Sequence, residues 1–165
     1  GYDVLLYDIS PESLEKALAT VNGNMARQVN KGIITEDERK AALERIVPVD
    51  DMAEFGECDL VIEAATEDED VKRAIFAELC PHLKPDALVG TNTSSLSITR
   101  LAAATDRPEK FMGVHFMNPV PLMELVELIR GIATDDETFR TIRRFVESLG
   151  KVPSVAEDFP AFIVN

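Results

Sequence analysis

The chain has no run of about 18 uncharged apolar residues, which is the length that a helix needs to cross a lipid bilayer. Its first residues, Gly1-Tyr2-Asp3, include neither the basic residues that begin a signal peptide nor an initiator methionine. We therefore expect no membrane span and no signal peptide. We also expect that the natural start of the protein lies upstream of Gly1.

Basic residues are scarce. The chain contains 17 lysines and arginines against 30 aspartates and glutamates, which gives a net charge of −13 at pH 7. This charge repels nucleic acid phosphates and anionic lipid surfaces at long range. We therefore expect no nucleic acid partner and no membrane partner.

Cysteine is also scarce. Cys58 and Cys80 are the two cysteines of the sequence, and they are not in CxxC spacing. Two cysteines are too few for a disulfide scaffold, and this usage is typical of a reducing compartment. We expect free, buried thiols and a cytoplasmic protein.

Apolar residues are plentiful, at 45% of 165 residues, which suits one globular domain with a core. Short apolar runs alternate with segments of helical periodicity, and Pro48 favours an edge or short strand at 46–49. The alternation predicts an α/β, Rossmann-like fold, with a doubly wound, mostly parallel sheet that binds ligands at the carboxyl ends of its strands. We expect strands at 3–8, 46–49, 59–64, 87–91, 111–116, 122–129 and 152–156.

Helical periodicity marks five segments. Ser10 and Pro11 are typical of a helix start, residues 30–32 interrupt the pattern, and Thr35 with Glu38 forms a capping box. The first two helices therefore predict a helical hairpin at about 11–45. In the third, Val71, Ile75, Phe76 and Leu79 share one face. The expected helices are 11–29, 35–45, 69–80, 98–104 and 135–149, the last opened by Thr134.

Asp8 closes the first apolar run. A dinucleotide-binding fold places an acid there to accept hydrogen bonds from the adenosine ribose, and this acid would repel the extra phosphate of NADP. A loop or helix-capping aspartate is an equal alternative. The glycine fingerprint that would precede it by about 20 residues is absent from the sequence, and we expect it to lie upstream of Gly1.

His115 is one of two histidines and lies between Val114 and Phe116 at the end of a predicted strand. A lone histidine is more often structural than catalytic. Here, however, Glu124 and Glu127 fall on opposite faces of the next strand, so one of them can be a buried acid that orients the imidazole. A carboxylate beside an imidazole raises its basicity and fixes its tautomer, as general-base catalysis requires.

Ser94 lies in a polar segment directly after the strand at 87–91. Serine is a common helix cap, and this interpretation is as strong as one in which the hydroxyl binds a substrate oxygen. His82 follows Pro81 at the end of a helix, where a capping role is more plausible than a catalytic one. We therefore leave His82 outside the candidate site.

Three segments resemble one family. NTSSLSIT at 92–99, GVHFMNPVPLMELVE at 113–127 and EDFPAFIVN at 157–165 are similar to the 3-hydroxyacyl-CoA dehydrogenases, among them the bacterial 3-hydroxybutyryl-CoA dehydrogenases. The resemblance covers essentially the whole chain. The spacings from serine to histidine, histidine to glutamate and histidine to asparagine all agree, so the signal is specific.

The resemblance implies a role for each catalytic residue. His115 would remove the hydroxyl proton of an (S)-3-hydroxyacyl-CoA while a hydride passes to NAD. Glu127 would orient His115 and stabilise its imidazolium. Ser94 and Asn165 would hydrogen-bond the reacting oxygens of the substrate.

The resemblance also implies the binding residues. Asp8 would hold the adenosine ribose, and Glu67 and Lys72 would contact the cofactor. Ser94 and Asn118 would lie beside the nicotinamide. The CoA contacts would be Ser94 and, in the helical hairpin, Asn24 and Lys31, where Lys31 can pair with a CoA phosphate. An exposed lysine in a loop that follows a helix is common anyway, so a neutral interpretation of Lys31 stays open.

By the same resemblance, residues 1–158 would form a partial NAD-binding domain that lacks its first strand and helix. Residues 159–165 would begin a helical domain that completes the substrate cleft, and the full-length protein would be a homodimer. We expect the isolated chain to be unstable or to aggregate, because apolar sheet surface would be exposed.

Three other functions are compatible with the sequence. The same fold could serve in a multifunctional β-oxidation protein or in a dehydrogenase of a free hydroxy acid. It could also be a structural relative without turnover, like the lens crystallins that resemble this family. The presence of Ser94, His115, Glu127 and Asn165 together argues against the structural role.

Overall fold

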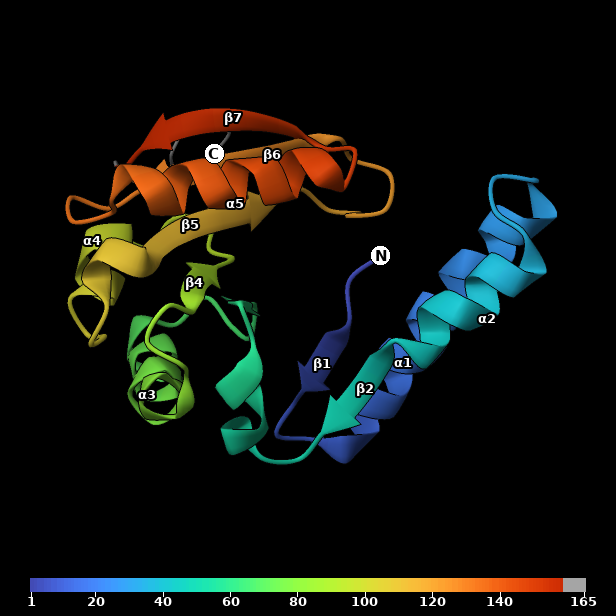
Figure 1. Cartoon of the computed structure of the whole chain (residues 1–165), viewed down its shortest axis with the longest axis horizontal. Coiled ribbons are helices and arrows are strands. Elements are labelled where there is room, and N and C mark those ends of the chain that lie inside the picture. Colours follow the sequence, from blue (N-terminus) through green and yellow to red (C-terminus); the bar gives the residue numbers. More distant parts are fainter. Residues whose placement is uncertain (159–165) are drawn as a thin grey trace. The chain divides into compact units, whose positions relative to one another are not determined.

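The structure is a computed structural model that describes residues 1–158. The chain divides into two compact units, Gly1–Glu54 and Phe55–Asn165 (Figure 1). Among the described residues, none of the helices is both long and apolar enough to span a membrane.

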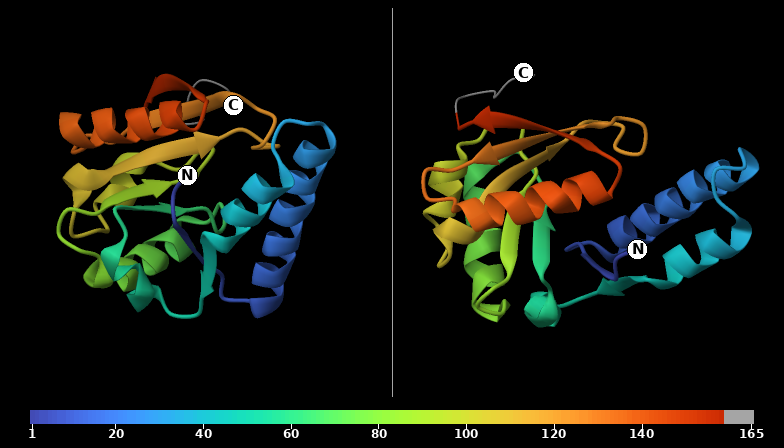
Figure 2. Two further views of the ribbon diagram at one scale, coloured as in Figure 1. Left: turned by 45° about the vertical axis from the view of Figure 1, so that its right-hand side comes forward. Right: turned by 45° about the horizontal axis from the view of Figure 1, so that its top comes forward.

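The first unit is a two-stranded parallel sheet whose strands are connected in the sequence by a helical hairpin. Strand β1 (Val4–Tyr7) pairs with β2 (Ile46–Val49), and the hairpin consists of α1 (Pro11–Asn30) and α2 (Glu36–Glu44), which lie side by side in Figure 2. Ser10 caps α1 by accepting a hydrogen bond from Ser13 N, and Thr35 caps α2 in the expected capping box. The predicted hairpin is confirmed.

The second unit is built on a five-stranded sheet in the order β3-β4-β5-β6-β7. The pair β5 and β6 is antiparallel and the other three pairs are parallel, so the predicted mostly parallel sheet is confirmed. The strands are β3 (Leu60–Glu63), β4 (Leu88–Thr91), β5 (Phe111–Phe116), β6 (Leu125–Arg130) and β7 (Val152–Glu157).

Three α-helices connect these strands. They are α3 (Glu69–Leu79), α4 (Ile98–Ala102) and α5 (Asp136–Ser148), and short 3-10 helices lie at Met52–Glu57, Cys80–His82 and Pro108–Lys110. The core forms where α5 covers the sheet, with Met112, Val114, Val126, Leu128, Ile142 and Val146 all buried. Gly113 faces the other side of the sheet, where a Cβ atom would lie 2.8 Å from Ile98 Cδ1 and 3.0 Å from Ile129 Cβ, so a larger residue does not fit unless these side chains shift.

Two predicted boundaries are wrong. Strand β6 begins at Leu125 rather than at Leu122, because the N–H groups of Leu122 and Met123 donate to the Pro119 carbonyl in a turn. Helix α5 is capped by Asp135 rather than by Thr134. The Thr134 hydroxyl instead donates to Phe111 O and accepts from Gly131 N.

The predicted apolar face of α3 is partly wrong. Val71 is exposed, whereas Lys72, Phe76 and Leu79 are the buried residues of the helix. The burial of Lys72 follows from an acidic partner on β3. Both cysteines are free, as expected, but Cys58 is half-buried and only Cys80 is fully buried.

Candidate active site at the carboxyl ends of β3, β4 and β5

His115 lies at the centre of a row of three polar side chains. Its Nδ1 atom is 2.9 Å from Glu127 Oε2, and its Nε2 atom is 3.2 Å from Ser94 Oγ. His115 and Glu127 face each other directly because they are partners in the antiparallel pair of β5 and β6. The structure thus brings together three residues that the sequence predicted as catalytic.

The burial of these side chains determines which nitrogen of His115 carries the proton. Glu127 has no exposed surface and His115 is 6% exposed. A carboxylate only accepts hydrogen bonds, so a neutral His115 donates its Nδ1 proton to Glu127 and keeps the lone pair on Nε2. That lone pair lies beside Ser94, where Nε2 can take a proton from a bound hydroxyl group. Glu124, the alternative acid, is exposed and precedes β6.

Glu67 holds the turn that carries Ser94. Its Oε1 atom accepts hydrogen bonds from Thr93 Oγ1 at 2.5 Å, Ser94 N at 2.8 Å, Ser95 N at 3.0 Å and Ser95 Oγ at 3.1 Å. Partial burial raises the pKa of the Glu67 carboxyl, but these hydrogen bonds outweigh it and keep the pKa below its ordinary value. Ser94 is not a helix cap, since Ser97 is the residue that caps α4.

Lys72 is buried beneath this turn. Its ammonium donates to both carboxylate oxygens of Glu63, at 2.7 and 2.9 Å, and the side chain has no exposed surface. Glu63 at the end of β3 compensates its charge, and the expected contact between Lys72 and the cofactor stays a prediction.

Asn118 lies two residues beyond the end of β5 and is exposed. It follows His115 by three residues, so it lies beyond the same carboxyl edge of the sheet as Ser94. Asn165, the fourth predicted catalytic residue, lies outside the described residues.

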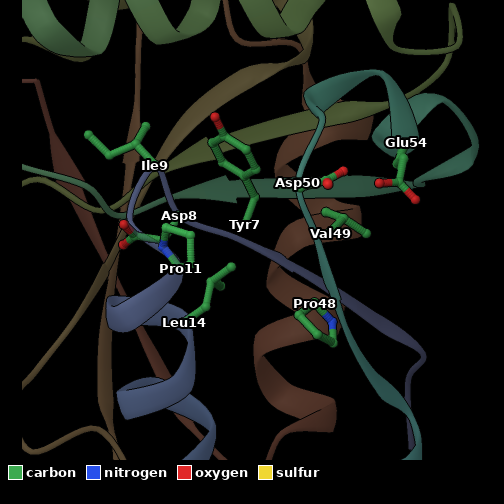
Figure 3. A pocket seen from close by; sticks show the side chains of 9 residues that line it. All are labelled: Tyr7, Asp8, Ile9, Pro11, Leu14, Pro48, Val49, Asp50 and Glu54. Carbon is green, nitrogen blue, oxygen red and sulfur yellow. The ribbon is translucent and has the colours of Figure 1, made fainter.

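Asp8 lies in the first unit, directly after β1, in a pocket drawn in Figure 3. Its carboxylate is exposed and accepts a hydrogen bond from Ser10 N at 2.8 Å, which orders the turn into α1. Figure 3 shows Asp8 beside Pro11 at the start of α1, and Asp50 and Glu54 on the side of β2. The pocket is lined by Tyr7, Asp8, Ile9, Pro11, Leu14, Pro48, Val49, Asp50 and Glu54.

The two predicted CoA contacts also lie in the first unit. The Asn24 side chain accepts a hydrogen bond from Arg27 within α1, and Lys31 is an exposed residue that caps the C-terminus of this helix. Gly32, with a φ of 69°, completes this helix end in a conformation that favours glycine. Lys31 therefore presents a cation in the loop between the two helices.

Four polar residues of the site were not singled out from the sequence. Glu63 and Thr91 end β3 and β4, and Asn92 follows Thr91. Asp158 accepts hydrogen bonds from Ser97 Oγ, Ile98 N and Thr99 N, which joins the end of β7 to the start of α4. No sequence signal pointed to Glu63, because the burial of Lys72, which requires an acid nearby, is itself visible only in the structure.

Comparison with known proteins finds a matching family, similar sequences and similar structures. The model of the family "3-hydroxyacyl-CoA dehydrogenase, NAD binding domain" matches residues 1–159. The 3-hydroxybutyryl-CoA dehydrogenase of Bradyrhizobium diazoefficiens is 62% identical over 165 residues, which are all of this chain and 56% of that protein. The chain thus spans about half the length of this relative.

Solved structures agree with the fold. A crystal structure of 3-hydroxybutyryl-CoA dehydrogenase from Escherichia coli has a TM-score of 0.96 and 42% identity, over 99% of this chain and 35% of that chain. The (S)-3-hydroxybutyryl-CoA dehydrogenase from Ralstonia eutropha has a TM-score of 0.96 and 40% identity, over 99% of this chain and 58% of that chain. The predicted Rossmann-like α/β fold is confirmed.

Proposed function

Because this chain belongs to the 3-hydroxyacyl-CoA dehydrogenase family, matching its NAD-binding domain, we propose that the protein carrying it oxidises (S)-3-hydroxyacyl-CoA to 3-oxoacyl-CoA. The observation that supports this proposal is the row formed by Ser94, His115 and Glu127. A general base with a buried orienting acid and a neighbouring hydroxyl is what the removal of an alcohol proton requires.

The proposed steps use these residues directly. NAD, when bound, would supply the acceptor for the hydride from C3 of the substrate. His115 Nε2 takes the hydroxyl proton, so a C=O bond replaces the C–H and O–H bonds, and the positive charge on the imidazole is stabilised by Glu127. Ser94 Oγ donates a hydrogen bond to the reacting oxygen, and Asn165 does the same by resemblance. In the reverse direction, His115 acts as the acid.

The cofactor assignment has support in the first unit. Asp8 is exposed at the carboxyl end of β1, where an acid can accept hydrogen bonds from the hydroxyls of the adenosine ribose. Its negative charge disfavours the extra phosphate of NADP. In the second unit, the proposed cofactor residues are Glu67, Lys72, Ser94 and Asn118, and Ser94 is also proposed to bind the substrate.

The proposed CoA contacts are two residues of the helical hairpin. Lys31 is a suitable partner for a CoA phosphate because it is an exposed cation in a loop. Asn24 is half-buried on α1, seven residues before Lys31. For the full-length protein, the family membership supports a homodimer in the cytoplasm.

The experiment that tests this function is acetoacetyl-CoA-dependent oxidation of NADH by the protein expressed from the complete reading frame that encodes this chain. NADPH and free acetoacetate serve as controls. Turnover with NADH and the CoA ester alone supports both the substrate class and the role of Asp8. A folded protein that binds NADH but has no turnover with the CoA ester contradicts the proposal, and turnover with free acetoacetate indicates a dehydrogenase of free hydroxy acids.

A further inference from the structure

Asn92 connects three segments of the second unit. It is the first residue after β4, and its N–H donates to Glu63 O at the end of β3, at 2.7 Å. Its side-chain Oδ1 accepts a hydrogen bond from Phe116 N on β5, at 2.9 Å. Its carbonyl oxygen accepts one from Lys72 Nζ on α3, at 3.3 Å. Backbone and side chain of Asn92 are therefore both fixed.

The anchor beneath Asn92 is a buried charged network. Lys72 and Glu63 form an ion pair that is 0% and 6% exposed, respectively, and Thr91 Oγ1 donates to Glu63 Oε2 at 2.6 Å. Ala65 N donates to Glu63 Oε1 at 2.7 Å, so both carboxylate oxygens have more than one partner. Buried networks whose members are all paired are rigid, because any displacement leaves a charge without a partner.

The position of Asn92 relates this anchor to the catalytic row. Ser94 follows Asn92 by two residues, and Phe116, whose N–H binds the Asn92 side chain, directly follows His115. Asn92 thus ties the segment that carries Ser94 to the segment that carries His115. The two groups to be held together, Ser94 Oγ and His115 Nε2, are 3.2 Å apart.

We propose that Asn92 is a positioning residue that sets Ser94 against His115, and that the buried Lys72 helps to hold it through the hydrogen bond to the Asn92 carbonyl. This inference rests on the proposed dehydrogenase function. A misplacement of reacting groups by about 1 Å is enough to cost roughly 10²-fold in rate, so a link of this kind controls turnover without touching the substrate.

The test compares two substitutions in the complete protein. Asn92→Ala removes the acceptor for Phe116 N, whereas Asn92→Asp keeps an oxygen at the same place. A matched control is Asn22→Ala, which removes a side-chain amide that accepts a hydrogen bond from Arg39 on the exposed face of the hairpin. The measurements are kcat and KM for NADH and for acetoacetyl-CoA.

The expected result is a split between kcat and KM. Asn92→Ala should lower kcat by roughly 10- to 100-fold while KM for NADH changes by less than about twofold. Asn92→Asp should recover most of kcat, and Asn22→Ala should equal the wild type. An unchanged kcat in Asn92→Ala, an equal loss in both Asn92 variants, or a loss confined to KM for NADH would each overturn the proposal. If Asn92→Ala does not fold, Asn92→Ser, whose side chain is too short to reach Phe116 N, takes its place.

A second readout separates this proposal from the proposed function. In ligand-free protein, Asn92→Ala should speed hydrogen exchange of the Phe116 N–H and shift the imidazole ¹H–¹⁵N resonances of His115, but not those of His82. If the wild type lacks turnover with acyl-CoA while these two changes occur, the dehydrogenase function fails and the positioning role stands. If neither signal changes, the positioning role fails whatever the wild-type activity.

Discussion

Glu127 lies directly opposite His115 across the antiparallel strands β5 and β6, with its Oε2 atom 2.9 Å from His115 Nδ1. Glu127 is completely buried, so water does not compete for this hydrogen bond. The imidazole therefore has one orientation, in which Nε2 lies beside the Ser94 hydroxyl. This relationship determines which nitrogen is the base and yields two predictions about turnover.

Replacing His115 by glutamine should lower kcat by roughly 10²- to 10⁴-fold, because glutamine can hydrogen-bond a substrate oxygen but cannot take its proton. The dissociation constant of NADH, measured by fluorescence titration, should change little. His82→Gln is the matched control, since His82 is exposed at the end of a 3-10 helix. An active His115→Gln enzyme would refute the assigned base.

Replacing Glu127 by glutamine should lower kcat by about 10- to 10³-fold, because the neutral amide stabilises the imidazolium less and no longer fixes the tautomer. Glu124→Gln offers a matched control three residues earlier, where the carboxylate is exposed. Steady-state kinetics with acetoacetyl-CoA measure both variants. Equal rates for Glu127→Gln and Glu124→Gln would rule out an orienting role for Glu127.

The catalytic row could be predicted from the sequence because Ser94 follows one strongly apolar strand, His115 lies near the end of the next, and Glu127 lies within the strand after that. The apolar run before Ser94 and the runs around His115 and Glu127 locate three strands, and the parallel arrangement brings strand ends to one edge of the sheet. The direct pairing of His115 with Glu127 needed the antiparallel register, which no local pattern specifies.

The parts that the sequence did not predict are the ones decided by tertiary contacts. Helical spacing put Val71 on the apolar face of α3. In the structure, Lys72 is buried because it pairs with Glu63, and Val71 is exposed. Thr134 has the pattern of a helix cap, yet Asp135 caps α5 because the Thr134 hydroxyl binds the end of β5. In both cases a polar partner distant in sequence outweighs local preference.

The buried pair of Lys72 and Glu63 predicts a large loss of stability on substitution. Lys72→Met leaves the Glu63 carboxylate buried without its ion-pair partner, so the free energy of unfolding should fall by about 3–5 kcal/mol. Lys84→Met breaks the pair of Lys84 with Asp59, whose side chain is 94% exposed, and should cost only about 0–1 kcal/mol. Urea unfolding of the complete protein measures both losses.

A double substitution tests the same pair from the other side. Glu63→Gln together with Lys72→Met removes both charges and should regain part of the stability lost in Lys72→Met. Equal losses in Lys72→Met and Lys84→Met would show that the buried pair contributes no more than the exposed one.

Asp135 gives a prediction about pH. The backbone N–H of Thr138 donates to the Asp135 carboxylate at the start of α5 and keeps the pKa of this carboxyl below its ordinary value. Its contribution is therefore complete above the unfolded pKa of about 3.9 and is lost as the pH falls through the lower folded pKa. Asp135→Ala should cost about 1 kcal/mol at pH 7, and this difference should shrink below about pH 4. Urea unfolding of both proteins from pH 7 to pH 3 measures it.

The control for this cap is Asp135→Asn, which keeps the acceptor oxygen without the charge. It should cost less than Asp135→Ala, and its stability relative to Asp135→Ala should not vary with pH. If the gap between wild type and Asp135→Ala is the same at pH 7 and pH 3, then the charge on Asp135 does not contribute to the cap.

Asp8 should determine the choice between NADH and NADPH. Asp8→Ser removes the carboxylate at the end of β1, which can accept hydrogen bonds from the ribose and repels a 2′-phosphate. Because a hydrogen bond to a charged group contributes about 1.5–3 kcal/mol, the ratio of kcat/KM for NADH to that for NADPH should fall by roughly 10- to 100-fold. Two other carboxylates line the same pocket, so Asp50→Asn and Glu54→Gln provide matched controls that should keep the wild-type ratio (Figure 3). If either control lowers the ratio as much as Asp8→Ser, the preference comes from the summed negative charge of the pocket rather than from Asp8.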